Sequence, residues 1–509
     1  MTAKHAEIRL AELVALLSLG TDLGLGQPME HAMRQCTIAM RLADRLGLDV
    51  SERPVLYYSG LLAWVGCHTD AYEQAKWFGD EIAMKFEGKT SGPTAMLRRL
   101  GAGRPLLERL RIAVEFLRAG VRDLGDMLTN HYLATDELAA RLGLGQDVRD
   151  CLGQSFERWD GKGPLELRRD QILMTSRLVS FADVIAVFHR QGGIEAAVGV
   201  AKKRSGAQLD PALVALFCSD AHELLRDLEP ASTWDAIISA EPALGARVAG
   251  DEFERALEAI ADFADLKSPW TIGHSRGVAE LVHDAAIDHG FPEPEVARVR
   301  RAALIHDIGH LGVPNSIWDK RGALTQIEHE RVRLHPYLGE RMLAHVPILA
   351  ELGVIAAQHH ERLDGSGYPG RLSGDAITPS GRLLAAADVY HALSHKRPHR
   401  PARGADEAAR ELRAMVTSGS LDGRAVDSVL RAAGHRVRRR REWPAGLTAR
   451  EVEVLRLLAC GLSNKEIADE LAITPKTASS HVEHIYAKIG ASNRARASLF
   501  AMKHGLMTA

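Results

Sequence analysis

The chain has 509 residues, a length that suits roughly three domains. Its hydrophobic share of 46% and charged share of 26% are those of a globular protein. Its net charge of −2 is too small to indicate a strongly charged binding partner. The five cysteines form no CxxC pair, and no run of 18 apolar residues or signal-peptide pattern occurs. These features argue against a disulfide framework, a zinc ribbon and a membrane partner, and we expect a cytoplasmic protein.

Helical periodicity dominates the chain from its first residues onward, and alternating strand patterns and hairpin signals are rare. We therefore predict an all-α fold. Breaks in the pattern fall near Glu241-Pro242 and in the charged stretch at 436–446. These breaks predict domains at 1–240 and 251–435, a basic linker at 436–446, and a small last domain at 447–509.

The first two predicted domains resemble each other. The segment YYSGLLAWVGC at 57–67 parallels RRAALIHDIGH at 300–310, and SFERWDGKGP at 155–164 parallels HHERLDGSGYP at 359–369. The offset is 243 residues early and 204 to 205 residues late, so the first copy carries about 39 extra residues in its middle. The early offset also pairs His31 with His274. Chance similarity between helices is the alternative, and the shared ERxDGxG pattern speaks against it.

The second copy collects imidazoles and carboxylates that suit a metal site. Imidazole and carboxylate without thiolate favour iron, manganese or zinc. Asp307 follows His306 directly, so it can ligate one ion and bridge to a second, and two such ions clamp a phosphodiester and activate water. The candidate ligands are His274, His306, Asp307, His335, His359, His360 and Asp388.

The pattern GHS…HDIG…H…HHERxDGSGYPG…D resembles the HD-GYP family, a subset of the HD-domain metal phosphohydrolases, over about residues 262–433. The resemblance implies hydrolysis of cyclic di-GMP, with the candidates above as ligands and His306, Asp307 and His310 at the catalytic centre. It also implies that the loop Gly367, Tyr368 and Pro369 shapes substrate access.

Basic side chains after the last candidate ligand are possible substrate contacts. Arg397 and Arg400 are candidate phosphate clamps because guanidinium pairs with phosphate through two hydrogen bonds. An exposed basic turn is the alternative for both. Asp364 is a candidate for proton transfer, but a turn-forming aspartate is the better interpretation.

Two departures from the family pattern bear on activity. His310 stands where the family usually has a lysine that touches the substrate phosphate, which leaves hydrolysis open. Trp270 stands where members with three metal ions have a glutamate, so we expect two divalent ions, iron or manganese. His310 could still donate a hydrogen bond or reach a metal ion.

The first copy lacks most of the ligand set. Ala63 and Trp64 stand at the positions of the HD pair, and Ser155 and Phe156 at those of the adjacent histidines. His31 and Asp183 remain, but two ligands cannot make a binuclear site. We therefore interpret 1–240 as a degenerate HD-like domain for dimerisation, regulation or sensing. His68 and His131 are either ligands of another group or structural residues, and lone histidines are more often structural.

The end of the chain is basic. Residues 436–509 hold 13 Lys/Arg against 7 Asp/Glu, which is typical of a nucleic-acid module. The five arginines of RVRRRREWPAG at 436–446 form either a solvated hinge or phosphate contacts beside that module.

Capping signals divide the last sixty residues into short helices. Thr448 with Glu451, and Ser463 with Glu466, are capping boxes, and Thr474 precedes a proline at the first position of a third helix. That helix runs to about residue 489, and a fourth follows at 493–502. Short helix, tight turn and longer helix is the geometry of a helix-turn-helix.

This stretch resembles the LuxR-type helix-turn-helix over nearly the whole motif, with Ala478 in place of the usual valine. The resemblance implies a domain that binds double-stranded DNA as a homodimer. It places Ser479, Ser480 and Glu483 at base-reading positions. The expected backbone contacts are Lys476, Thr477, His481 and Lys488.

The sequence thus predicts a transcriptional regulator in which a metal-dependent HD-GYP phosphodiesterase, acting on cyclic di-GMP, is coupled to DNA binding. The alternative is a hydrolysis-inactive HD-GYP domain that senses a nucleotide and metal and gates DNA binding. A third possibility is a different phosphodiester substrate, because HD folds serve many reactions.

Overall fold

The structure, a computed structural model, describes residues 7–91, 99–102, 104–228, 233–242, 245–434 and 443–507. The all-α prediction is confirmed, since helices form most of these residues and strands very few. The one sheet among them pairs β1 (Glu7–Arg9) with β2 (Arg247–Ala249) in antiparallel register, Ile8 opposite Val248. Three-residue strands so far apart in sequence leave no hairpin signal, which is why the sequence did not predict them.

Two compact units divide the chain, residues 7–253 and residues 254–509. Among the described residues, no helix has both the length and the apolar character needed to span a bilayer. Most of the predicted linker, residues 435–442, lies outside the described residues.

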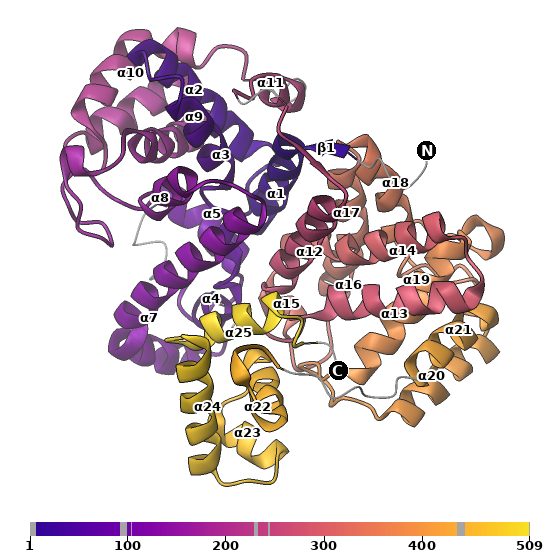
Figure 1. Ribbon diagram of the computed structural model, residues 1–509. Helices are drawn as coiled ribbons and strands as arrows, with labels where there is room; N and C mark the ends of the chain where they lie inside the picture. The colour runs from indigo at the N-terminus through magenta and orange to yellow at the C-terminus, as the bar shows by residue number, and fades with distance from the viewer. Residues whose placement is uncertain are drawn as a thin grey trace. The chain divides into compact units, whose positions relative to one another are not determined.

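The first unit is built around α2, α3 and α9, whose buried faces include Ile38, Leu56, Phe181 and Ile185. Figure 1 shows α2 and α9 running beside each other. Its helices are α1 (Leu10–Gly24), α2 (His31–Leu46), α3 (Glu52–Leu62), η2 (Val65–His68), α4 (Ala71–Phe78), α5 (Glu81–Ser91), α7 (Leu106–Arg141), α8 (Gln146–Gly153), η3 (Arg169–Gln171), α9 (Met174–Arg204), α10 (Pro211–Leu224) and α11 (Thr233–Ser239).

The second unit begins with a bundle in which α13 packs against α14, α19 and α21 (Figure 1). Its helices up to the linker are α12 (Asp251–Asp265), α13 (His274–His289), α14 (Glu293–Ile305), η5 (Ile308–Gly312), α15 (Asn315–Trp318), α16 (Gln326–Arg333), α17 (His335–Leu343), α18 (Pro347–Ala356), η6 (Gly374–Ala376), α19 (Pro379–Ser394), α20 (Ala405–Thr417) and α21 (Gly423–Gly434).

The internal repeat is visible at the start of α2 in the first unit and of α13 in the second. Helices α2 and α13 start at His31 and His274, each preceded by a residue in the left-handed conformation. Nine residues before each histidine, a buried carboxylate, Asp22 or Asp265, accepts a hydrogen bond from the backbone N–H just after the histidine, at 3.2 and 2.9 Å. The same bond at the same spacing supports a common scaffold.

A second shared device holds the loop of the ERxDGxG pattern. The Glu157 carboxylate accepts from backbone N–H groups at positions 165 and 167, and the Glu361 carboxylate from those at 370 and 372. Within each loop a glycine, Gly163 or Gly367, approaches the neighbouring backbone so closely that a Cβ there would lie within 2.7 and 2.5 Å of main-chain atoms. Both loops therefore need glycine at this position.

The last helices form the predicted helix-turn-helix. They are η7 (Pro444–Gly446), α22 (Ala449–Ala459), α23 (Asn464–Glu470), α24 (Pro475–Ile489) and α25 (Arg494–Lys503). Both capping boxes and the Thr474 cap are confirmed by their hydrogen bonds. A compact apolar core around Leu455, Ile467 and Ile485 holds these short helices, which would be marginal alone.

Candidate metal centre

The structure brings the predicted ligands together from five helices. His274 begins α13, and His306 and Asp307 follow the end of α14. The remaining ligands come from the start of α17, the segment after α18 and the middle of α19, namely His335, His359, His360 and Asp388. All are buried except His360, which is half-buried.

Asp307 lies at the centre of this group. Its Oδ2 is 3.3 Å from Nε2 of His306 and 3.7 Å from Nε2 of His274. Its Oδ1 is 3.4 Å from Nε2 of His335 and 3.5 Å from Nε2 of His359. The two oxygens of one carboxylate therefore face two different sets of imidazoles, the arrangement of a ligand that bridges two ions.

The other ligands sort onto the same two sides. Asp388 Oδ1 lies 3.1 Å from Nε2 of His274 and 3.9 Å from that of His306, so it completes the set at Oδ2. His335, His359 and His360 have ligand atoms within 4.8 Å of one another, and the first two of them face Oδ1. Separations near 3 to 4 Å are those of atoms sharing a cation with bonds of about 2 Å.

The ring orientations provide a test of whether a cation fits. Nδ1 of His306, His335 and His359 each lies 2.6 to 2.7 Å from the carbonyl oxygen three residues earlier, so Nδ1 carries the hydrogen. In the neutral rings the Nε2 atoms then present lone pairs inward, and those of His335 and His359 face each other at 3.0 Å. Two facing lone pairs repel unless a cation joins them, so the residues fit a metal site.

Unsatisfied atoms point to the same conclusion. Within the described residues, Nε2 of His306, Oδ1 of Asp307 and Nε2 of His310 are buried without a hydrogen-bond partner. Orphaned buried polar atoms are costly and rare, and three in one cluster indicate a missing partner. Metal coordination would satisfy all three at once.

Charges in the cluster need compensation by a cation. Burial opposes ionisation of Asp307, yet the nearby imidazole of His306 holds its pKa well below the usual range. Burial would lower the pKa of His306, but Asp307 raises it to about 9. The site thus takes up positive charge, and protons on His306 compete with metal ions for the same position.

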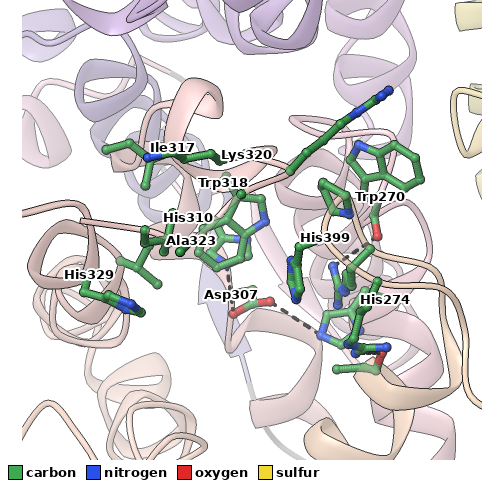
Figure 2. Close-up of a pocket in the computed structure, with 18 of the residues that line it drawn as sticks. Trp270, His274, Asp307, His310, Ile317, Trp318, Lys320, Ala323, His329 and His399 are labelled. Atoms are coloured by element: carbon green, nitrogen blue, oxygen red, sulfur yellow. Dashed lines mark hydrogen bonds and ion pairs between the residues drawn. The ribbon is translucent and has the colours of Figure 1, made fainter. Parts of the chain in front are cut away.

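His310 lies among the candidate ligands, close to Asp307 and His335. Its ring lies 3.5 Å from the Trp318 ring centroid, and its Nε2 is 3.7 Å from Oδ1 of Asp307. Figure 2 shows Asp307 between His310 and His274. Burial holds the pKa of His310 well below its usual value, so the ring is neutral and cannot replace an ammonium group.

The GYP loop (Gly367, Tyr368 and Pro369) packs against the candidate metal ligand His360. The Tyr368 ring stacks at 4.6 Å on His360, and its backbone N–H donates to the His360 carbonyl. None of Gly367, Tyr368 and Pro369 lines the cavity that adjoins the metal centre. Asp364 accepts hydrogen bonds from the backbone and hydroxyl of Ser366, which is the turn-forming role.

A cavity of about 660 Å³ adjoins the centre, and His274, Asp307, His310 and His360 form part of its wall. Besides aliphatic residues, its wall contains aromatic and basic side chains, namely Trp270, Trp318, Lys320, Arg321, Arg397 and Arg400. Apolar faces combined with positive charge suit an aromatic anion, and the volume lies within the range of ordinary ligand sites.

The two predicted phosphate clamps differ. Arg400 donates hydrogen bonds to main-chain carbonyls at 392, 393, 395 and 401, so its guanidinium is occupied at the end of α19. Arg397 donates one bond, to the Trp270 carbonyl. Arg397 is therefore the better placed of the two to contact a ligand.

Sequence reasoning missed several side chains of the site. His391 lies 2.9 Å from His274, Nδ1 to Nδ1, one turn after Asp388, and that spacing on a helix could have revealed it. Lys320 and Arg321 reach the cavity from the loop after α15, and no sequence signal indicated this. Lys320 also pairs with Glu328 at 2.6 Å.

The matching region of the first unit is filled by aromatic rings. Trp64 and Phe156 pack edge to face at 5.2 Å, and His131 packs on Phe156 at 4.7 Å. His31 Nε2 and Asp183 Oδ1 still face each other at 3.7 Å. The rings at the former ligand positions and the remaining His31–Asp183 pair agree with the interpretation of a degenerate site.

The candidate DNA-contacting residues lie along α24. Lys476, Thr477, Ser480, Glu483 and Lys488 are exposed. Lys488 also donates to Glu451 at 2.7 Å and to the Gly446 carbonyl, so it stabilises the domain whether or not it meets DNA. The half-buried candidates are Ser479 and His481.

Comparison with known proteins agrees with this geometry. Residues 258–425 match the HD domain family, and residues 445–501 match the bacterial regulatory proteins of the luxR family. The chain is 30% identical over 419 residues to the 3'3'-cGAMP-specific phosphodiesterase 3 of Vibrio cholerae, covering 80% of this chain and 91% of that relative. It is 36% identical to a cyclic di-GMP phosphodiesterase of Thermotoga maritima, over 32% of this chain and 44% of the relative.

One solved structure resembles the chain over most of its length. A crystal structure of a cyclic GMP-AMP specific phosphodiesterase from V. cholerae superposes with a TM-score of 0.60 at 25% identity. The match covers 85% of this chain and 99% of that one, so it includes both units.

Proposed function

The chain belongs to the HD-GYP family of metal-dependent HD-domain phosphohydrolases and ends in a LuxR-family helix-turn-helix; from this we propose that it hydrolyses a cyclic dinucleotide and couples that reaction to DNA binding. The observation that carries the enzymatic part is the carboxylate of Asp307, whose two oxygens face separate imidazole sets beside a 660 Å³ cavity. The domain limits 1–240, 251–435, 436–446 and 447–509 are part of the proposal.

The ligand set divides between two ions, iron or manganese. His274, His306 and Asp388 would hold one, His335, His359 and His360 the other, and Asp307 both. Bound there, the ions supply a Lewis acid and an activated water nucleophile for the phosphodiester. The protein's own part is to fix each imidazole by its Nδ1 hydrogen bond, which keeps Nε2 free for coordination.

The cavity walls suit a dinucleotide. Trp270 and Trp318 offer aromatic faces on which purine bases stack. Arg397 and Arg321 offer guanidinium groups for phosphate oxygens. These groups would replace the positive charge that the family lysine supplies and that the neutral His310 does not.

The experiment is hydrolysis of cyclic di-GMP and 3',3'-cGAMP by protein loaded anaerobically with iron or manganese. The relative that matches across both units is named as cGAMP-specific, which favours cGAMP over cyclic di-GMP. Turnover that requires metal and vanishes in His306→Ala supports the proposal. No turnover of either substrate by fully loaded protein contradicts it.

A second candidate function is binding without turnover, and His310 favours it. Its neutral ring lies against Trp318, where a lysine would carry charge toward the substrate. Under this alternative, His310→Lys would gain hydrolysis of about tenfold or more, since a charge-assisted phosphate contact contributes about 1.5–3 kcal/mol. A loss of turnover in that variant would favour His310 as a functional ligand of an active enzyme.

Coupling to DNA is supported by packing inside the second unit. The apolar core of the helix-turn-helix extends onto Leu266 and Ile272, in the segment that leads into His274. A Cβ on Gly273, the residue before this ligand, would collide with Met507. A change at His274 therefore has a direct route to the DNA-binding domain.

The DNA-binding part of the proposal is a cytoplasmic homodimer on double-stranded DNA. Ser479, Ser480 and Glu483 would read bases, and Lys476, Thr477, His481 and Lys488 would contact the backbone. Fluorescence anisotropy with operator fragments tests it. Ser480→Ala is expected to weaken specific binding by about 1–3 kcal/mol and non-specific binding little. Equal losses on specific and random DNA would remove the base-reading assignment.

A further inference from the structure

The first unit contains a cavity of about 380 Å³ that lies outside the site proposed above. Its walls come from α2, α9 and the segment after α10. Four of its lining side chains are apolar, namely Ile38, Ala186, Leu225 and Leu228. The other four are polar or charged, namely Arg34, His189, Arg190 and Asp227.

Positive charge predominates in this cavity. The Nε of Arg34 is buried without a hydrogen-bond partner among the described residues. Burial and the proximity of Arg34 lower the pKa values of both His189 and Arg190. The carboxylate of Asp227 is 86% exposed and lies 3.5 Å from Arg226, so it neutralises little of the interior charge.

Arg190 is already held in place. Its guanidinium donates to Gln27 at 2.5 Å and lies 3.4 Å from Nδ1 of His31. Asp22 and Asp183 also act on its charge. Arg34 is therefore the cationic group of the cavity that remains available, with Arg190 as a fixed neighbour and the neutral imidazole of His189 as a further polar group.

Comparison with the second unit explains how this cavity arose. At the repeat offsets, Arg34 matches Gly277 and Ala186 matches His391. In the second unit His391 fills the space against Gly277, where a Cβ would lie 1.9 Å from its Nε2. In the first unit the ring is reduced to a methyl group and the glycine becomes an arginine. Where the second unit has the His391 ring, the first unit therefore has a cavity lined by Arg34 and Ala186.

We propose that this cavity binds a small organic phosphate, of about the size of a nucleoside monophosphate, with the phosphate on Arg34 and His189 and the apolar body on Ile38 and Leu225. The Arg34 guanidinium and the His189 imidazole, which lie close enough to interact, offer several hydrogen-bond donors and match the oxygens of a phosphate better than a single carboxylate. The apolar wall and the volume match a ligand with a sizeable body rather than an inorganic ion. The inference does not depend on turnover in the second unit.

The test is calorimetric titration of the full chain with GMP, in EDTA so that the second unit holds no metal. Arg34→Gln is compared with Arg111→Gln, which changes an arginine that is 77% exposed on α7. We expect one site per chain, at least tenfold weaker binding in Arg34→Gln, and unchanged binding in Arg111→Gln. Guanosine without phosphate should bind at least tenfold more weakly than GMP.

Leu228→Glu provides a second variant should Arg34→Gln fail to fold, because it places a carboxylate at a half-buried position of the wall. It should weaken GMP binding to a similar extent. Binding of GMP that is equal in wild type, Arg34→Gln and Leu228→Glu would overturn the site. Malonate binding as tight as GMP would overturn the phosphate assignment, and no binding at millimolar GMP would overturn both.

Discussion

The two related units share the hydrogen bonds that hold the site helix and loop, but they differ in the side chains that these elements surround. In both, a buried aspartate holds the start of the first site helix, and a glutamate holds the ERxDGxG loop. In the second unit the supported space holds imidazoles and carboxylates with unpaired atoms, whereas in the first it holds the packed rings of Trp64 and Phe156. The scaffold is therefore separable from the chemistry, and the ligands can be lost without loss of the fold.

The difference also shows where each unit obtains stability. The first unit buries apolar surface at its former site, which stabilises the fold directly. The second keeps buried polar atoms unsatisfied in the protein alone, which costs free energy that bound ions would offset. Matched changes in the two units should therefore have opposite consequences for activity and for stability.

The largest expected effect is on turnover. Asp307→Asn removes the bridging charge, and since metal ions contribute several kcal/mol of transition-state stabilisation, hydrolysis should fall roughly a thousandfold. Asp183→Asn changes the remnant carboxylate of the first unit and should leave turnover within about twofold of wild type. Steady-state hydrolysis of the cyclic dinucleotide measures both, and equal losses would remove the functional distinction between the units.

The second effect is on the free energy of unfolding, and here the change in the first unit should have the larger effect. Trp64→Ala removes a ring that packs on Phe156 and donates to Gln35 at 2.9 Å, and should destabilise the protein by about 3 kcal/mol. Asp307→Asn in metal-free protein should be destabilised less than Trp64→Ala, because the lost pairing with His306 is partly offset by removal of a buried carboxylate. Urea denaturation followed by circular dichroism tests both. An Asp307→Asn apoprotein destabilised more than Trp64→Ala would contradict the account.

A third effect comes from metal binding to the folded state. Mn²⁺ at about 100 times its dissociation constant should stabilise the second unit by about 2.7 kcal/mol and leave the first unchanged. In a calorimetric scan of wild type, Mn²⁺ should raise the temperature of one unfolding transition. In His306→Ala, Mn²⁺ should leave that transition unchanged. A shift of both transitions, or a shift that persists in His306→Ala, would place metal binding elsewhere.

The smallest effect concerns the glycine shared by the two loops. Gly367→Ala forces a Cβ to within 2.5 Å of the His360 carbonyl oxygen, so metal affinity should fall about 10- to 100-fold through displacement of His360. Gly163→Ala makes the matching clash in the first unit and should lower its stability without altering metal affinity. Metal titration of both variants provides the comparison, and equal affinities would show that the loop does not position the ligand.

Much of the site could be predicted because its signals are local or ordered along the chain. The capping boxes at Thr448 and Ser463 define their helices through contacts three residues apart, so the DNA-binding domain follows from sequence alone. The candidate ligands could be identified from the order of the motifs, and the structure brings them together. The offset between the two copies placed Trp64 at the position of the HD pair.

What could not be predicted depends on long-range packing. The division of the Asp307 oxygens between two imidazole sets requires the approach of α17 and α18, which no motif encodes. The contact of His310 with Trp318 and the arrival of Lys320 in the cavity depend on the path of one loop. The cavity at Arg34 arises from two substitutions about 150 residues apart in the chain.

The most direct test of the central claim is the metal content of the purified protein, measured by mass spectrometry on the samples used for hydrolysis. The account predicts two ions of iron or manganese per chain in wild type and in Asp183→Asn. It predicts loss of both ions, together with turnover, in Asp307→Asn. Two ions retained in Asp307→Asn, or hydrolysis that persists without metal, would contradict a bridging role for Asp307 and the mechanism built on it.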